Sequence, residues 1–69
     1  HARFMAECGQ TPMDYLRSRR LHMALGLLRE TALAIGEIAA RVGYASQSAF
    51  SAAMLREFGA SPGALRRAA

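Results

Sequence analysis

Residues 33–59, LAIGEIAARVGYASQSAFSAAMLREFG, decide the fold of this 69-residue chain. Apolar residues recur at helical spacing on both sides of Gly43. Glycine readily adopts the left-handed backbone conformation that ends a helix, and Ser46 is a favourable N-cap for the next one. The stretch therefore predicts a short helix over residues 35–42, a sharp turn at Gly43, and a second helix over residues 47–58.

The remaining sequence also favours helices, because it has no sustained alternation of apolar and polar residues and few β-branched ones. Thr11 and Pro12 are typical of the start of a helix, which we expect to run to about Arg29. Ser61 and Pro62 begin a last short helix in the same way. We therefore expect an all-α chain.

The helix over residues 47–58 has two faces of different character. The inward face is expected to hold Phe50, Ala53, Met54 and Phe58. The opposite face is small and polar toward its N-terminus and carries Ser48, Ser51, Ala52, Leu55 and Arg56. A tight glycine turn followed by such a helix is typical of a helix-turn-helix, which sets its second helix into the DNA major groove.

We predict DNA contacts in and after the first turn of this helix. Gln47 can pair bidentately with adenine, and Ser48 can donate or accept a hydrogen bond. Ser46 and the free N–H groups of the turn can hold a phosphate, and Arg56 is a further phosphate candidate. The alternative is that Ser46 only caps the helix and that Gln47 and Ser48 are only solvated.

The composition limits other functions. Nine arginines, no lysine and five acidic residues give a net charge of +4, which agrees with nucleic-acid binding but is weak evidence alone.

Cys8 is the single cysteine of the sequence, which excludes an internal disulfide. Since the only histidines are His1 and His22, we also expect no metal site. No nucleophile has a base at useful spacing, so we expect no catalysis and no cofactor. No apolar run is long enough to span a membrane and no signal peptide is visible, so we expect a cytoplasmic protein.

The chain also contains an internal repeat at a shift of 50 residues. It pairs Phe4 with Met54, Glu7 with Glu57, Gly9 with Gly59, Thr11 with Ser61, Pro12 with Pro62, Tyr15 with Leu65 and Arg17 with Arg67. Each copy is a helix end, a glycine cap and a Ser/Thr-Pro helix start. Because the first copy begins in mid-helix, we expect residues 1–9 to be the end of a truncated first helix-turn-helix. Residues 10–31 would be a linker helix, and residues 32–69 a complete second unit with its short C-terminal helix.

Five motifs in order along nearly the whole chain resemble the AraC/XylS family of transcription regulators. They are Pro12-x-x-Tyr15-Leu16, Arg20-Leu21-x-x-Ala24-x-x-Leu27-Leu28, Leu33-x-Ile35-x-Glu37-Ile38-Ala39, Val42-Gly43-Tyr44-x-Ser46-Gln47-Ser48-x-Phe50-Ser51 and Phe58-Gly59-x-Ser61-Pro62-x-x-Leu65-Arg66.

The resemblance implies a homeodomain-like bundle in which two helix-turn-helix units are joined by a long helix, each unit reading one major-groove segment. It places DNA contacts of the second unit at Gln47, Ser48, Ser51 and Ala52. The partners it implies are double-stranded DNA and RNA polymerase, and the usual role is activation of transcription. No enzyme activity or cofactor is implied.

The sequence departs from the family at three places. Ala52 and Leu55 are uncharged where the family often has basic residues, which removes candidate DNA contacts. Ala34 replaces a serine that commonly caps the short helix, a loss of roughly 1 kcal/mol. We expect only a stub of the first recognition helix in residues 1–9. We therefore expect the fragment to bind DNA weakly.

Other residues of the long helix carry further predictions. Arg20 lies on an apolar stripe and would need a partner if buried, for which Glu37 is the candidate. Leu21, Leu25 and Leu28 form a second apolar stripe. Two stripes fit a helix packed between two helix-turn-helix units, and in a fragment that lacks most of the first unit one stripe would have nothing to pack against. We therefore expect a homodimer or helix exchange through these leucines.

The rival function is an all-helical protein-interaction or dimerisation module with incidental basic charge.

Arg66 and Arg67 are more simply explained as solvated side chains than as side chains that attract DNA nonspecifically.

Overall fold

The computed structural model describes residues 11–68, and all the regular structure in that range is helical. The elements are α2 (Pro12–Glu30), α3 (Ile35–Arg41), α4 (Gln47–Phe58) and α5 (Pro62–Arg67). The predicted bounds are confirmed to within one residue, and the all-α fold class is confirmed. The end of an earlier helix, predicted at residues 1–9, lies outside the described residues.

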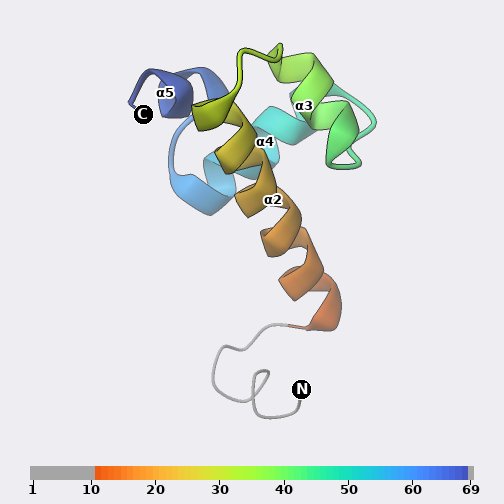
Figure 1. Ribbon diagram of the computed structural model, residues 1–69. Helices are drawn as coiled ribbons and strands as arrows, with labels where there is room; N and C mark the ends of the chain where they lie inside the picture. The colour runs from red at the N-terminus through yellow and green to blue at the C-terminus, as the bar shows by residue number, and fades with distance from the viewer. Residues whose placement is uncertain (1–10, 69) are drawn as a thin grey trace.

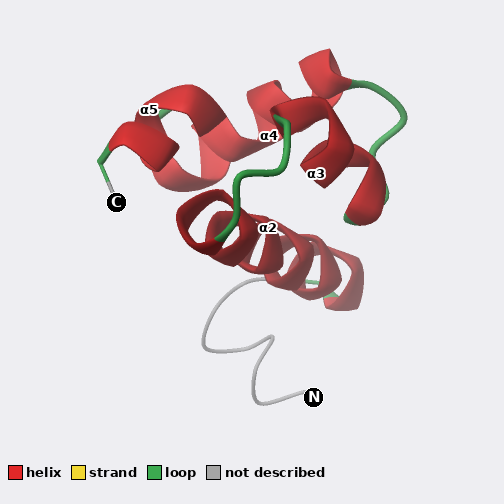
Figure 2. Cartoon of the chain, turned by 45° about the horizontal axis from the view of Figure 1, so that its top comes forward, coloured by secondary structure: helices red, strands yellow, loops and turns green. Residues whose placement is uncertain are grey.

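The long helix α2 forms one layer, and the three shorter helices form a second layer on one side of it (Figure 2). They gather around its C-terminal part, while its N-terminal part extends away from them (Figure 1). Between residues 11 and 68, no helix is long and apolar enough to cross a membrane.

Side-chain caps fix where most of these helices begin. Thr11, Ser46 and Ser61 each accept a hydrogen bond from the backbone N–H three residues later. The N-cap of α3, Ala34, has no such bond, as its sequence predicted. In the first turn of α2, the hydrogen bond from Arg17 lowers the pKa of Asp14, helped by hydrogen bonds from Thr11.

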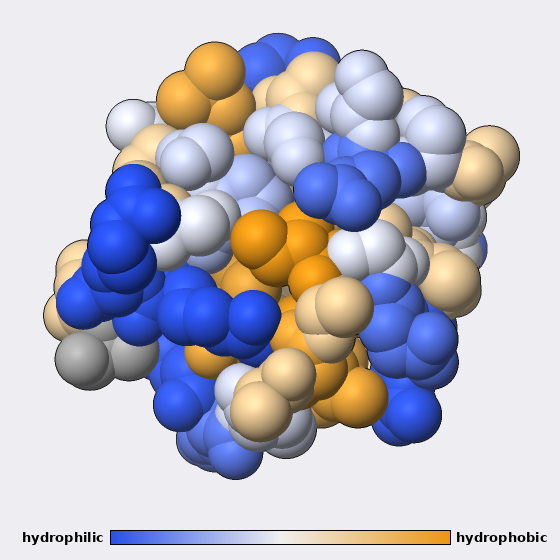
Figure 3. Space-filling view, turned by 90° about the horizontal axis from the view of Figure 1, so that it is seen from above, coloured by the Kyte–Doolittle hydropathy of each residue, from blue (hydrophilic) through white to orange (hydrophobic). Residues whose placement is uncertain are grey.

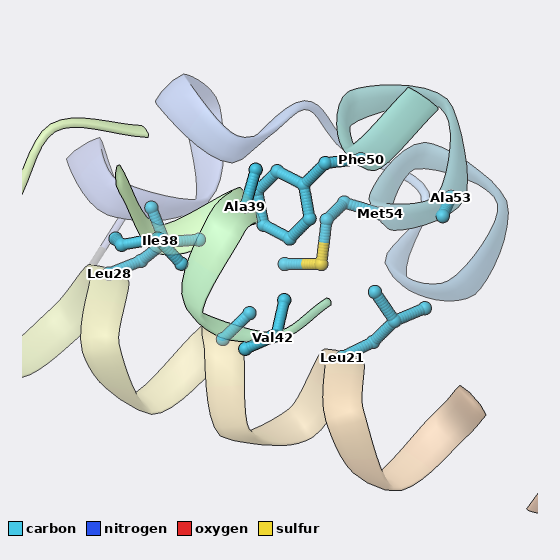
Figure 4. Packing of buried hydrophobic residues seen from close by; sticks show 9 residues of the cluster. Leu21, Leu28, Ile38, Ala39, Val42, Phe50, Ala53 and Met54 are labelled. Carbon is cyan, nitrogen blue, oxygen red and sulfur yellow. The ribbon is translucent and has the colours of Figure 1, made fainter. Parts of the chain in front are cut away.

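The core lies between α2, α3 and α4 (Figure 4). Its buried members are Leu21, Ala24, Leu28, Ile38, Ala39, Val42, Phe50, Ala53 and Met54. The predicted inward face of α4 is confirmed, since Phe50, Ala53 and Met54 are buried and Phe58 is partly buried against them. Burial of each large apolar side chain stabilises the fold by roughly 1.5–3 kcal/mol.

The leucine stripe predicted for dimerisation belongs to this core, so the expectation that it lacks a partner within the chain is wrong. Leu21 and Leu28 are each 1% exposed, and Leu25 is partly buried. The stripe that contains Arg20 is divided, since Ala24 is buried in the core and Leu27 packs against it. The large apolar side chains that stay exposed on α2 are Met13, Tyr15, Leu16 and Met23.

The predicted pair between Arg20 and Glu37 is also wrong. Arg20 is exposed, and Glu37 instead accepts a hydrogen bond from Nε of Arg41 at 3.1 Å. Arg41 lies one turn away from Glu37 on the same helix, so this pair needs no long-range arrangement. The guanidinium of Arg20 lies over the turn, where a Cβ added to Gly43 would be 3.8 Å from Nη1 of Arg20.

Arg66 joins α5 to the end of α2. Its Nε donates to the carbonyl of Leu28 at 3.1 Å, and its Nη2 donates to the carbonyls of Leu33 at 2.7 Å and Thr31 at 3.3 Å. These carbonyls belong to the last turn of α2 and the loop before α3, where no further helical N–H groups are available to donate to them. The prediction of a solvated or DNA-directed side chain is therefore wrong for Arg66, whereas Arg67 is exposed.

We predict that Arg66→Ala lowers the free energy of unfolding by about 2 kcal/mol, because three carbonyls lose a charged donor. Arg67→Ala, which removes the same charge from the next position, should change it by less than about 0.5 kcal/mol. Urea unfolding followed by circular dichroism measures both. Equal effects of the two variants would contradict a structural role for Arg66.

Two glycines form a second matched pair. A Cβ added at Gly26 or at Gly59 meets no other atom within 4 Å, so only the backbone distinguishes them. Gly26→Ala should stabilise the chain by about 0.5–1 kcal/mol, because Gly26 is helical. Gly59→Ala should destabilise it by about 1–2 kcal/mol, because Gly59 has φ 75°. Shifts of the same sign in thermal unfolding would contradict this assignment.

Candidate nucleic-acid interface

The turn between α3 and α4 sets the direction of α4. Gly43 has φ 95°, and its N–H donates to the carbonyl of Ala40 at 3.1 Å. The N–H of Tyr44 then donates to the carbonyl of Ala39 at 2.9 Å. These bonds close the end of α3 while the chain bends away from it, as in the C-terminal motifs that require a left-handed residue. The predicted bend at Gly43 is confirmed.

The start of α4 leaves backbone donors facing solvent. Ser46 is extended, with φ −147° and ψ 155°, and its Oγ accepts from the N–H of Ala49 at 3.0 Å. The predicted cap is therefore present. The other N–H groups of a first helical turn have no acceptor within the helix. The positive end of the helix dipole also lies here, so these N–H groups can bind an anion.

Both residues predicted to read bases lie at this end of α4. Gln47 and Ser48 are exposed, in agreement with the prediction that they face outward. Gln47 folds back toward α3, since a Cβ added at Gly36 would be 3.1 Å from its Oε1. Sequence reasoning missed Gly36 as a neighbour of Gln47, because no helical spacing connects residues on either side of a turn.

The other candidates follow along the same helix. Ala52 and Arg56 are exposed, and Ser51 is partly buried. Leu55 leaves 54% of its surface exposed on the same side. The structure thus brings all the predicted contact residues onto α4 and its cap, and the opposite side of the helix is the one that packs into the core.

Contacts on the inner side of α4 hold it in place. The rings of Tyr44 and Phe50 meet edge to face with centroids 5.7 Å apart. Near the other end, Oγ of Ser18 on α2 donates to Oε2 of Glu57 at 2.8 Å. The ring of Phe58 meets that of His22 at 5.1 Å. Both ends of α4 are therefore tied to the body of the domain, and its outer residues have a fixed platform.

Hydrophilic and apolar groups lie side by side on the face of the molecule that Figure 3 shows. Seen from above the view of Figure 1, strongly hydrophilic groups surround a central apolar strip (Figure 3). On α3, Arg41 is paired with Glu37, and on α4 the basic residue is Arg56. Within residues 11–68, no group of three or more His, Cys, Asp or Glu side chains could hold a metal ion.

Comparison with known proteins connects this geometry to a family. The family described as "Helix-turn-helix domain" matches residues 1–68. Among curated proteins, the chain is 44% identical over 59 residues to the HTH-type transcriptional regulator AlkR of Acinetobacter baylyi, covering 86% of this chain and 19% of that protein. It is also 44% identical over 66 residues to a putative AraC-like transcription regulator of Streptomyces lividans, covering 96% of this chain and 22% of that protein.

A solved structure shows the same architecture. The DNA-binding domain of AdpA, described as a global transcriptional factor in complex with a target DNA, superposes with a TM-score of 0.83 at 33% identity. The match covers 97% of this chain and 60% of that one. The chain therefore spans about a fifth of the length of the curated relatives named above and somewhat more than half of this domain. With a family match over almost its whole length, two helices joined by a glycine turn and a motif order typical of these regulators, the chain belongs to the AraC/XylS-type helix-turn-helix family of transcription regulators.

Proposed function

We propose that this chain is a sequence-specific double-stranded DNA-binding module of a transcription regulator, in which α4 enters the major groove. The observation that carries the proposal is α4 itself. Its inner side is buried in the core, and its outer side presents exposed, mostly small side chains beyond the Gly43 turn. The AdpA domain, which has this fold, was solved with a target DNA, and this supports the same use here.

Within this proposal the residues divide into two roles. Gln47 and Ser48 contact base edges, and Ser51 and Ala52 lie further along the groove. The backbone N–H groups beside Ser46 and the guanidinium of Arg56 contact phosphates, which position the helix without reading sequence. The Oγ of Ser46 accepts the cap hydrogen bond from Ala49, which leaves its O–H group free to donate to the same phosphate.

The role of the whole protein extends this proposal. Members of a transcription-regulator family act on promoters, so we expect RNA polymerase as a partner and activation as the outcome. A second helix-turn-helix, joined through α2, would read the next major-groove segment about one helical turn away.

One observation favours a second candidate function, a protein-interaction module. Met13 and Met23 on α2 leave 67% and 60% of their surface exposed, and Leu16 leaves 49%. Exposed apolar side chains on one helix can contribute to a docking surface. This function predicts binding that depends on α2 and is insensitive to salt, whereas DNA binding depends on α4 and on salt.

The test is fluorescence anisotropy of labelled duplex DNA with the full chain at several salt concentrations. Neutralising each phosphate releases a counterion, so the logarithm of the affinity should fall linearly with the logarithm of salt, with a slope of about −0.9 per contact. No binding to any duplex at low salt, or binding without salt dependence, would refute the proposal.

Variants of α4 should separate its two roles. Arg56→Ala should weaken binding to all duplexes alike and make the salt slope smaller by about one. Gln47→Ala should reduce the preference between sequences by about 1–3 kcal/mol and leave the slope unchanged.

The matched control is Arg19→Ala. It removes the same charge from an exposed position of α2, next to Ser18, which contacts the inner side of α4. Its slope should equal that of the unaltered chain, and a decrease as large as that of Arg56→Ala would contradict the phosphate role of Arg56.

A further inference from the structure

The middle of the outer face of α4 carries no charge and no amide. Ser48, Ala52 and Leu55 are spaced by four and then three residues, so they lie in one line along the helix. All three are exposed, and this line is opposite the buried residues Phe50 and Ala53. A helix placed in the groove with its core-facing side turned away would therefore present a hydroxyl, a methyl and an isobutyl group along its centre.

The charged side chains of α4 lie off this line. Glu57 is held by Ser18 of α2 on the inner side of the helix, where their oxygens are 2.8 Å apart. Arg56 follows Leu55 by one residue and is therefore turned by about 100° around the helix axis. This position favours the phosphate backbone at the flank of a groove over the base edges at its centre.

Each base pair presents a different set of hydrogen-bonding groups and methyl groups in the major groove, and each set is matched by different side chains. Guanine is read mainly by arginine or lysine, and cytosine by a carboxylate that accepts from its amino group. Thymine differs from all other bases in showing a methyl group in the major groove, which an apolar side chain such as alanine contacts. Adenine is read bidentately by asparagine or glutamine, and Gln47 stands at the start of the same helix.

We infer, on the basis of the DNA-binding function proposed above, that α4 selects A·T base pairs. Ala52 and Leu55 contact the methyl groups of thymines, and Gln47 pairs with an adenine. The small side chain of Ala52 allows the helix backbone to come close to the base edges. Contact between the exposed side chain of Leu55 and a thymine methyl group removes apolar surface from water, which favours binding.

The experiment begins with selection of duplexes from a randomised library by the full chain at low ionic strength. We expect A·T pairs to be enriched at the positions that α4 covers. Each thymine of the enriched duplex is then replaced singly by deoxyuridine, which lacks only the methyl group. The affinity should fall about fourfold at each contacted thymine, the effect of one buried methyl, and should not change elsewhere.

Variants of Ala52 identify the side chain responsible. In Ala52→Gly, thymine and deoxyuridine should be bound equally at one position. Ala40→Gly makes the same change at an exposed alanine of α3, with a similar loss of helix propensity, and should keep the difference. Ala52→Arg should shift the enriched sequence toward a G·C pair at that position, because arginine pairs with guanine.

The outcomes are distinct. Absence of salt-dependent binding to any duplex would refute the DNA-binding function, and this inference with it. Salt-dependent binding with enrichment of G·C pairs, or with no response to deoxyuridine, would refute the selection of A·T pairs alone. A loss of deoxyuridine sensitivity in Ala40→Gly as well would show that Ala52 is not the contacting residue.

Discussion

Phe50 and Met54 hold α4 against the rest of the molecule, and the whole arrangement depends on that contact. Both side chains are fully buried between α2 and α3. Because they lie one turn apart on the same side of the helix, they fix its rotation as well as its position. The turn at Gly43 determines the angle at which α4 leaves α3, and the burial of these two residues keeps it there. The outer face of α4 is thus defined by what the inner face touches.

A second constraint acts at the other end of the domain. The last turn of α2, the loop before α3 and helix α5 meet at the guanidinium of Arg66. A short loop without regular structure would otherwise leave several carbonyls without donors. By supplying those donors from α5, the chain connects its last helix to the segment that starts the helix-turn-helix. Because a small domain has a modest core, these hydrogen bonds contribute a substantial part of its stability.

The sequence was sufficient for the helices and their ends, because glycine, proline and serine act locally. Thr11, Ser46 and Gly59 each determine a helix end through their own backbone or side chain, so their positions predict the structure directly. Contacts between distant residues were harder to predict. The sequence did not reveal that Arg66 binds carbonyls of α2 and of the loop before α3, or that Glu37 does not pair with Arg20. The leucine stripe of α2 was recognised, but the sequence did not reveal that α3 and α4 of the same chain cover it. For the candidate site, the outward position of Ser48 and Ala52 followed from helical periodicity, whereas the DNA contacts proposed for them depend on a partner that periodicity does not describe.

The separation of the two sides of α4 has an evolutionary consequence. Ser48, Ala52 and Leu55 take no part in the core, so replacing them should cost little folding stability, and under the proposed function it would change the DNA sequence that is bound. Ancestors and descendants of this chain could therefore exchange one operator for another through single substitutions without an intermediate that fails to fold. Under the proposed function, substitutions at these three positions would change the promoters that such a regulator recognises without loss of its fold.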